Sequence, residues 1–201
     1  MPYKNTPRVR EGEPETFLHQ AGEVRQRELV ERLAASGPEG LTVLVRAFSE
    51  SRTSRLRCYI LDTLRTLDDP RVLPLIEAGL EDSSSSTRCH AIEALLIQPG
   101  PEPCRLLLPL LRDPSAVPRC RAIEAAARLD CGSPDTVAEL LECATHPDWR
   151  VRTAAARALG VLRVEDGMEQ LRAMAGDPRN AVRVAAAGAL QQLAGAGSEG
   201  L

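Results

Sequence analysis

One segment of this chain recurs every 31 residues, and this periodicity constrains the fold more than any other feature. Three Arg-Cys pairs stand at Arg57-Cys58, Arg88-Cys89 and Arg119-Cys120. Two further steps of 31 residues reach Arg150-Val151 and Ala181-Val182, so we expect five segments in one frame. A period of this length indicates a stack of small supersecondary units that bury their apolar sides against one another.

The composition favours helices as these units. Hydrophobic residues make up 43% of the 201 residues, whereas aromatic residues make up only 2%. Leu, Ala, Val and Ile must therefore supply the core, which suits closely packed helices better than β-sandwiches. The formal net charge of −3 argues against a nucleic-acid partner.

The sequence also lacks the signals of membrane insertion and export. No stretch approaches the ~18 consecutive apolar residues of a membrane span, and the polar residues 1–15 lack the apolar region of a signal peptide. We therefore expect a cytoplasmic protein with no membrane partner, whose six cysteines stay reduced.

Breaker residues divide the chain. We expect an irregular leader at 1–14, a capping helix with its stop at 15–37, a repeat solenoid at 38–194 and a flexible tail at 195–201. The capping helix is predicted over Glu15–Ala35, before the breaker Ser36-Gly37-Pro38. Asp69-Pro70 and Ser133-Pro134 each place a capping residue before a proline, which predicts that helices begin there.

The second helix of each repeat has apolar residues at helical spacing. In the frame of 31, Val151 and Val182 take the position of the three repeated cysteines, which predicts a small buried hydrophobe there. Four residues beyond this position stand acids in the first three copies and alanines in the last two. The residues concerned are Asp62, Glu93 and Glu124, then Ala155 and Ala186. We therefore expect this face to become more basic toward the C-terminus.

The segment from Asp148 to Gly160 resembles the second helix of a HEAT repeat. It has an aspartate in the turn, then Val-Arg, an alanine-rich run and Ala-Leu-Gly, and the segment from Asp177 repeats most of this pattern. The short period is similar to that of bacterial HEAT-like repeats of the bilin-lyase type. The resemblance covers about 38–194. It implies an all-α, right-handed α-solenoid of about five HEAT-like helical hairpins with an N-terminal helical cap.

Catalytic and metal-binding motifs are missing from the sequence. His19, His90 and His146 do not occur in the His-Glu pairs of HEAT-like diiron hydroxylases. Cys104, Cys131 and Cys143 show no C-x-x-C spacing, so we expect no metal site. Phosphate-binding loops and a Ser/His/Asp triad are also absent. The prediction is a protein that is not an enzyme and has no cofactor.

Two rows of side chains remain as candidates for a binding surface. In the frame of 31, one row holds Arg57, Arg88, Arg119 and Arg150, and the other holds Tyr59, His90, Arg121, Arg152 and Arg183. The resemblance implies that second helices line a concave face, so these rows would follow one groove, with His90 exposed. A structural alternative also stands, because HEAT repeats often pair this arginine with a turn aspartate. The aspartate belongs to the same repeat or to the next one, and Asp148 and Asp177 are placed for this role with Arg152 and Arg183.

We therefore predict a non-catalytic scaffold or adaptor that binds another protein. The arginines favour a partner with an acidic segment. The predicted partner-binding residues are Arg119, Arg121, Arg150, Arg152, Arg157, Arg183, Tyr59, His90 and Trp149, the last of which is expected in a turn. The alternatives are a bilin-lyase-like enzyme or chaperone and a HEAT-like nucleic-acid binder. The alanine-rich end from Val182 to Ala194 also suggests self-association through the C-terminal repeat.

Overall fold

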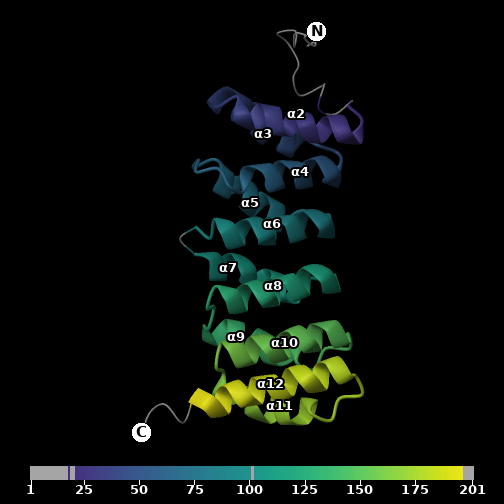
Figure 1. The fold of residues 1–201 in the computed structure, drawn as a ribbon, viewed down its shortest axis with the longest axis vertical. Coiled ribbons are helices and arrows are strands. Elements are labelled where there is room, and N and C mark those ends of the chain that lie inside the picture. Colours follow the sequence, from purple (N-terminus) through teal and green to yellow (C-terminus); the bar gives the residue numbers. More distant parts are fainter. Residues whose placement is uncertain (1–17, 19–20, 101, 197–201) are drawn as a thin grey trace, which may run out of the picture.

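The computed structural model describes Leu18 and residues 21–100 and 102–196. Within these residues the chain is helical and contains no strand. Figure 1 shows the helices as successive layers of one elongated stack, from α2 and α3 at one end to α11 and α12 at the other. This arrangement is the all-α solenoid that the 31-residue period predicts.

One row of neighbouring helices runs the length of the stack. Its members, each in contact with the next, are α2 (Glu23–Ala35), α4 (Ser54–Leu64), α6 (Ser85–Ile97), α8 (Ala116–Arg128), α10 (Trp149–Val161) and α12 (Asn180–Ala196). From α4 onward these are the predicted second helices. The helix α2 begins the row and packs on both α3 and α4, as expected for a cap.

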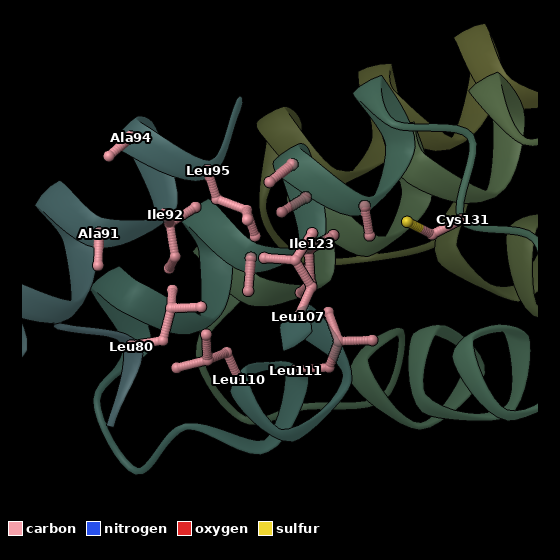
Figure 2. Close-up of a cluster of buried hydrophobic side chains, with 14 of the residues drawn as sticks. Leu80, Ala91, Ile92, Ala94, Leu95, Leu107, Leu110, Leu111, Ile123 and Cys131 are labelled. Carbon is pink, nitrogen blue, oxygen red and sulfur yellow. The ribbon is translucent and has the colours of Figure 1, made fainter. Parts of the chain in front are cut away.

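The first helices of the five hairpins lie behind this row. They are α3 (Pro38–Glu50), α5 (Val72–Leu80), α7 (Pro103–Leu107) with the 3-10 helix η1 (Leu108–Arg112), α9 (Pro134–Cys143), and the 3-10 helix η2 (Glu165–Gly167) with α11 (Met168–Met174). Leu, Ile, Val and Ala side chains of both rows form one continuous core from Leu18 to Ala189. Figure 2 shows part of this core, in which Ile92 and Leu95 of α6 lie beside Leu107 of α7 and Ile123 of α8.

The predicted helix ends are correct in some places and wrong in others. The capping helix does not run unbroken over Glu15–Ala35, because Ala21 and Gly22 are non-helical and α2 begins only at Glu23. The expected leader at 1–14 lies outside the described residues. At the other end, α12 continues to Ala196, so the first two residues of the expected tail are helical, and 197–201 are not described.

Of the two helix starts predicted from a capping residue before a proline, one is correct and one is wrong. Ser133 caps α9 as expected, since its hydroxyl accepts the N–H of Thr136 at 3.3 Å and Pro134 is the first helical residue. Asp69 does not cap α5. Its carboxylate instead accepts the N–H and the guanidinium of Arg71, which holds residues 69–71 in a turn, and the helix begins at Val72.

The repeat frame shifts by two residues between the third and fourth copies. The second helices of the five hairpins begin at Ser54, Ser85, Ala116, Trp149 and Asn180, so the third step is 33 residues and the others are 31. Arg152 and Arg183, not Arg150 and Ala181, therefore continue the position of Arg57, Arg88 and Arg119. The predicted equivalence of Val151 and Val182 with the repeated cysteines is wrong, and Thr153 and Val184 take that position.

The same shift changes the acidic row. The fourth and fifth copies place Arg157 and Gly188 where the first three place Asp62, Glu93 and Glu124, so Ala155 and Ala186 are not the replacements. Both alanines are completely buried between helices. The row thus changes from acidic to basic at α10, because an arginine replaces the acid.

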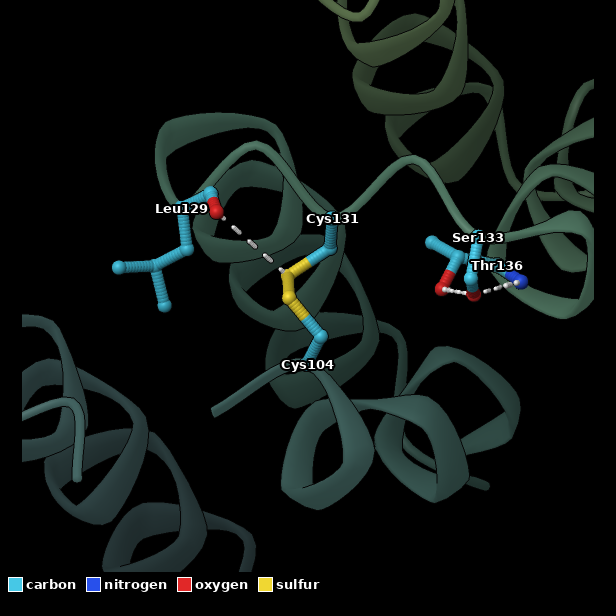
Figure 3. Close-up of a disulfide and its surroundings, with 5 residues drawn as sticks. All are labelled: Cys104, Leu129, Cys131, Ser133 and Thr136. Atoms are coloured by element: carbon cyan, nitrogen blue, oxygen red, sulfur yellow. Dashed lines mark hydrogen bonds between the residues drawn. A yellow bond between two sulfur atoms is a disulfide. The ribbon is translucent and has the colours of Figure 1, made fainter. Parts of the chain in front are cut away.

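A disulfide joins Cys104 in α7 to Cys131 in the loop after α8 (Figure 3). The expectation that all cysteines stay reduced is therefore wrong for this pair. Both residues belong to one hairpin, and their Cα atoms are 5.4 Å apart, within the usual range for a disulfide. The sequence separation of 27 residues carries no recognisable motif. Only the antiparallel packing of α7 and α8 brings the two thiols together.

Candidate functional site

An arginine at the start of each second helix in the five hairpins binds the preceding turn. In every copy its guanidinium donates to the backbone carbonyl six residues earlier, at 2.6–2.9 Å. The five arginines are Arg57, Arg88, Arg119, Arg152 and Arg183. The same carbonyl-bearing residue accepts the N–H two residues further on with its own side chain. These five turn residues are Ser51, Asp82, Asp113, His146 and Asp177.

Three of these arginines also bridge to the next repeat. Arg57 pairs with Asp82, Arg88 with Asp113 and Arg152 with Asp177, each over 25 residues. Arg88 and Arg152 each use two parallel N–H···O bonds, the geometry in which Arg–carboxylate pairs are strongest. Arg57 donates one bond, from Nη2 to Asp82 Oδ1 at 3.0 Å, and its Nε lies 2.6 Å from Oδ2 without forming a hydrogen bond. The hydrogen bonds from Arg152 lower the pKa of Asp177. We call the arginine contacts with the turns, together with these bridges to the next repeat, the turn ladder.

The turn ladder contains the predicted pairing with the next repeat for Asp177 but not for Asp148. Asp177 receives Arg152 from the previous repeat, whereas Arg183 donates to the backbone oxygen of Asp177. Asp148 pairs with Arg150, two residues away, at 2.6 Å. The ladder lacks a carboxylate where His146 replaces aspartate. There Arg119 donates only to backbone carbonyls, those of Arg112 and Asp113.

Hollows lie along the face that the second helices form within the described part of the chain. An N-terminal cleft of about 830 Å³ lies over α4 and α6, beside the start of α2. A C-terminal cleft of about 460 Å³ lies over α8, α10 and the start of α12. Between them a middle hollow of about 290 Å³ shares Arg121 and Glu124 with the C-terminal cleft.

The nine predicted partner-binding residues fall into three places. Arg119, Arg152 and Arg183 belong to the turn ladder, where their guanidinium groups bind the protein itself. Tyr59 and His90 line the N-terminal cleft. The remaining four, which line the C-terminal cleft, are Arg121, Arg150, Arg157 and Trp149.

The C-terminal cleft combines exposed apolar and basic groups. Trp149 is the first residue of α10, not a turn residue, and is 38% exposed; Val117 on α8 is 54% exposed. The side chain of Arg121 is 51% exposed and lies 3.7 Å from Glu93. Arg157 is exposed and makes no ion pair within the described chain. Three arginines and one carboxylate, that of Glu124, line the cleft, so the lining is basic on a chain that is acidic overall. Arg150 is paired with Asp148, so Arg121 and Arg157 supply most of the exposed positive charge.

The N-terminal cleft holds an arrangement that the sequence analysis missed. His90 is not an exposed member of a polar row, because its Nδ1 lies 2.8 Å from Asp62 Oδ1 on the neighbouring helix and its side chain is 31% exposed. Cys58 lies one helical turn before Asp62 and also lines this cleft. The available signal was the i, i+4 spacing of Cys58 and Asp62, which places both on the face that meets the next second helix.

The described residues contain neither a metal-binding cluster nor a membrane-spanning helix. No three His, Cys, Asp or Glu side chains among them gather closely enough to hold a metal ion. None of the described helices combines the length and the apolar character needed to cross a bilayer.

The stacked hairpins and the turn ladder define a helical repeat protein of the α-solenoid class. A family model of HEAT repeats matches residues 41–125 and 104–191. The chain therefore belongs to the HEAT-repeat family. No curated protein matches the sequence.

Several solved structures of similar fold are of designed or engineered proteins. Two engineered proteins from the Northeast Structural Genomics Consortium are 20% and 18% identical, each with a TM-score of 0.58, over 90% of this chain and 95% and 98% of theirs. A designed armadillo repeat protein in complex with the peptide (KR)4 is 13% identical, with a TM-score of 0.60, over 90% of this chain and 98% of that one. These likenesses concern the fold.

Proposed function

We propose that this chain is a non-catalytic scaffold that binds another protein in its C-terminal cleft. The observation that carries the proposal is the exposure of Trp149 and Val117 beside two arginines, Arg121 and Arg157, in one hollow. Large apolar side chains that stay exposed in a concave site, with charged groups at the rim, are typical of protein interfaces. Tryptophan and arginine are the residues that most often dominate binding energy.

The charge of the lining indicates the chemistry of the partner. Arg121, Arg150 and Arg157 line the cleft, and Glu124 is the one acid among its lining residues. A segment that carries carboxylates next to an apolar side chain complements this surface. The apolar side chain would cover Trp149 and Val117, and the carboxylates would meet the arginines, which form bidentate bonds with them.

One protein of similar fold supports the proposal that this chain binds a protein segment, although it does not identify the partner. The designed armadillo repeat protein holds a (KR)4 peptide, so a stack of similar shape offers a surface long enough for an extended peptide. That peptide is basic, whereas the lining of the C-terminal cleft favours an acidic one.

Affinity capture followed by measurement with purified partner tests the proposal. The wild-type chain identifies the partner, and calorimetry then compares Trp149→Ala and the double variant Arg121→Glu/Arg157→Glu. We expect each to weaken binding tenfold or more, with stronger salt dependence for wild type than for the double variant. Arg172→Glu is the matched control, because Arg172 is exposed on α11, behind the row of second helices. Unchanged affinity in both cleft variants would rule out this surface.

Self-association through the C-terminal repeat stays a separate proposal. The last helix of the row, α12, carries Val184, which is 62% exposed. Light scattering of wild type beside Val184→Lys tests it. A concentration-dependent dimer that the variant abolishes supports the contact, and a monomer at all concentrations rejects it.

A further inference from the structure

Cys58 lies on the floor of the N-terminal cleft, where α4 meets α6. Its side chain is buried, with 6% of the residue exposed, yet it lines the cleft. The Cys58 Sγ lies 3.7 Å from Ser86 Oγ and 3.9 Å from Thr87 Oγ1, both at the start of α6. The thiol is therefore surrounded by hydroxyl groups, unlike a cysteine that only fills an apolar core.

His90 lines the same cleft as this thiol and is bound to a carboxylate. It lies one turn after Ser86 on α6, and its Nδ1 is bound to Asp62 Oδ1 at 2.8 Å. Because Asp62 occupies Nδ1, Nε2 is the ring nitrogen available to the Cys58 thiol. Cys58 and Asp62 both come from α4, so two adjacent second helices build the whole arrangement. A thiol, an imidazole and an orienting carboxylate in this order form the arrangement that activates nucleophilic cysteines.

The pKa values agree with this geometry. Burial, the largest influence, raises the pKa of the Cys58 thiol, but hydrogen bonds with His90 and Ser86 and the imidazolium charge outweigh it and the pKa is lowered. The hydrogen bond with Cys58 and that with Asp62 raise the pKa of His90 to about 9 against the effect of desolvation. Burial raises the pKa of the three other free cysteines, and that of Cys143 reaches about 11. Those three are Cys89, Cys120 and Cys143.

Further charged side chains lie near the Asp62–His90 pair. From α4, Arg65 lies 4.0 Å from Asp62 and 3.8 Å from Glu93 of α6. From α8, Arg121 lies 3.7 Å from Glu93. Asp62 thus has a second cation, Arg65, besides the His90 imidazole, and Glu93 lies near both Arg65 and Arg121. Arg52, which is exposed, also lines the cleft and adds positive charge.

We propose that Cys58 is a nucleophilic thiol, positioned by His90 and Asp62, that forms a covalent adduct with α,β-unsaturated carbonyl compounds that enter the N-terminal cleft. The sulfur forms a bond to the β-carbon as the C=C π bond breaks, and its electron pair moves to the α-carbon as an enolate. The proton that His90 takes from the thiol then goes to the α-carbon. The addition needs no leaving group and no oxidant or reductant. Arg52 in the lining of the cleft favours acceptors that also carry a carboxylate.

Competitive alkylation of the full chain with N-ethylmaleimide tests this assignment. Limited treatment at a series of pH values, followed by peptide mass spectrometry, gives the rate at each free cysteine. We expect Cys58 to react at least tenfold faster at pH 7 than Cys89 and Cys120, with its pH–rate profile shifted to lower pH. A Cys58 rate equal to or below theirs would overturn the proposal.

Variants separate activation from simple accessibility. We expect His90→Gln to slow Cys58 at least tenfold and to move its pH–rate profile upward, and Asp62→Asn to have a smaller effect in the same direction. Asp68→Asn, an exposed carboxylate beyond the end of α4, is the matched control. Slow labelling of the buried Cys143 confirms that each variant is folded. If folded His90→Gln kept the wild-type rate and profile, His90 would have no role and the proposal would fail.

Discussion

Arg88 donates from Nε and Nη2 to the two carboxylate oxygens of Asp113, at 2.6 and 2.8 Å, across the boundary between two repeats. Their side chains are only 11% and 2% exposed. In a solenoid, each repeat touches only its neighbours, so contacts of this kind fix how successive hairpins stack. Packing of the apolar core holds the repeats together but is not directional. The bidentate pair is directional and therefore specifies the angle between successive hairpins.

Replacing Arg88 by Met should destabilise the fold strongly, because Asp113 would remain buried without its cation. Breaking such a pair costs about 3–5 kcal/mol. Urea denaturation followed by circular dichroism measures the loss. Arg121→Met removes an exposed arginine from the same helix row and should change stability by less than about 1 kcal/mol. Equal losses of unfolding free energy in the two variants would show that the turn ladder stabilises the fold no more than an exposed arginine does.

His146→Asp should stabilise the protein by restoring the interrupted ladder. His146 already accepts the N–H of Asp148 in the way that the turn aspartates accept theirs. A carboxylate there would also receive Arg119, whose guanidinium now meets only carbonyls. We expect a gain of about 0.5–1.5 kcal/mol, measured as a higher unfolding temperature. The double variant His146→Asp/Arg119→Met should lose this gain, and a gain that survived there would come from another cause.

Reduction of the Cys104–Cys131 disulfide should weaken the third hairpin. The bond closes a loop across a separation of 27 residues, for which chain entropy gives a stabilisation of about 3–4 kcal/mol. Calorimetry with and without reductant measures the effect, and thiol titration of the denatured protein should find four free thiols before reduction. A Cys104→Ser/Cys131→Ser variant should not respond to reductant. If wild type were equally indifferent, the bond would contribute nothing to stability.

Two glycines in the last repeats should respond to alanine in opposite ways. A Cβ on Gly160 of α10 would lie 2.7 Å from Ala189 Cα of α12, so Gly160→Ala should push these helices apart at a cost of about 1–3 kcal/mol. A Cβ on Gly188 would meet nothing within 4 Å. Gly188→Ala should therefore stabilise α12 by up to about 1 kcal/mol. Thermal unfolding of the two variants side by side checks both signs.

The protein should lose stability as the pH falls below 4. The hydrogen bonds of Arg150 and of Arg71 hold the pKa values of Asp148 and Asp69 at about 2, against an ordinary 3.8, and Arg152 lowers that of Asp177. Because the unfolded chain binds protons first, this stabilisation is complete above pH 4 and disappears toward pH 2. Asp177→Asn should flatten the slope of unfolding free energy against pH in this window, and Asp68→Asn should not.

Several features were predictable from sequence because they depend on local pattern. The periodic apolar residues and the breaker clusters predict the alternating helices, and the Ser133-Pro134 pair predicts the start of α9. The frame shift was also recoverable. Pro114, Pro147 and Pro178 each precede by five residues an arginine of the turn ladder, and this spacing is independent of the Arg-Cys pairs.

The periodic amino-acid sequence by itself determined that this protein is a stack of helical hairpins with arginines repeated along one row. Only the tertiary structure decided which arginines bind turns and which line a cleft, because a shift of two residues on a helix turns a side chain by more than half a revolution. The Cys104–Cys131 bond and the grouping of Cys58, Asp62 and His90 likewise depend on how neighbouring helices pack. The disulfide joins residues 27 positions apart and the Asp62–His90 bond joins residues 28 positions apart, and no local pattern encodes the distance between such residues.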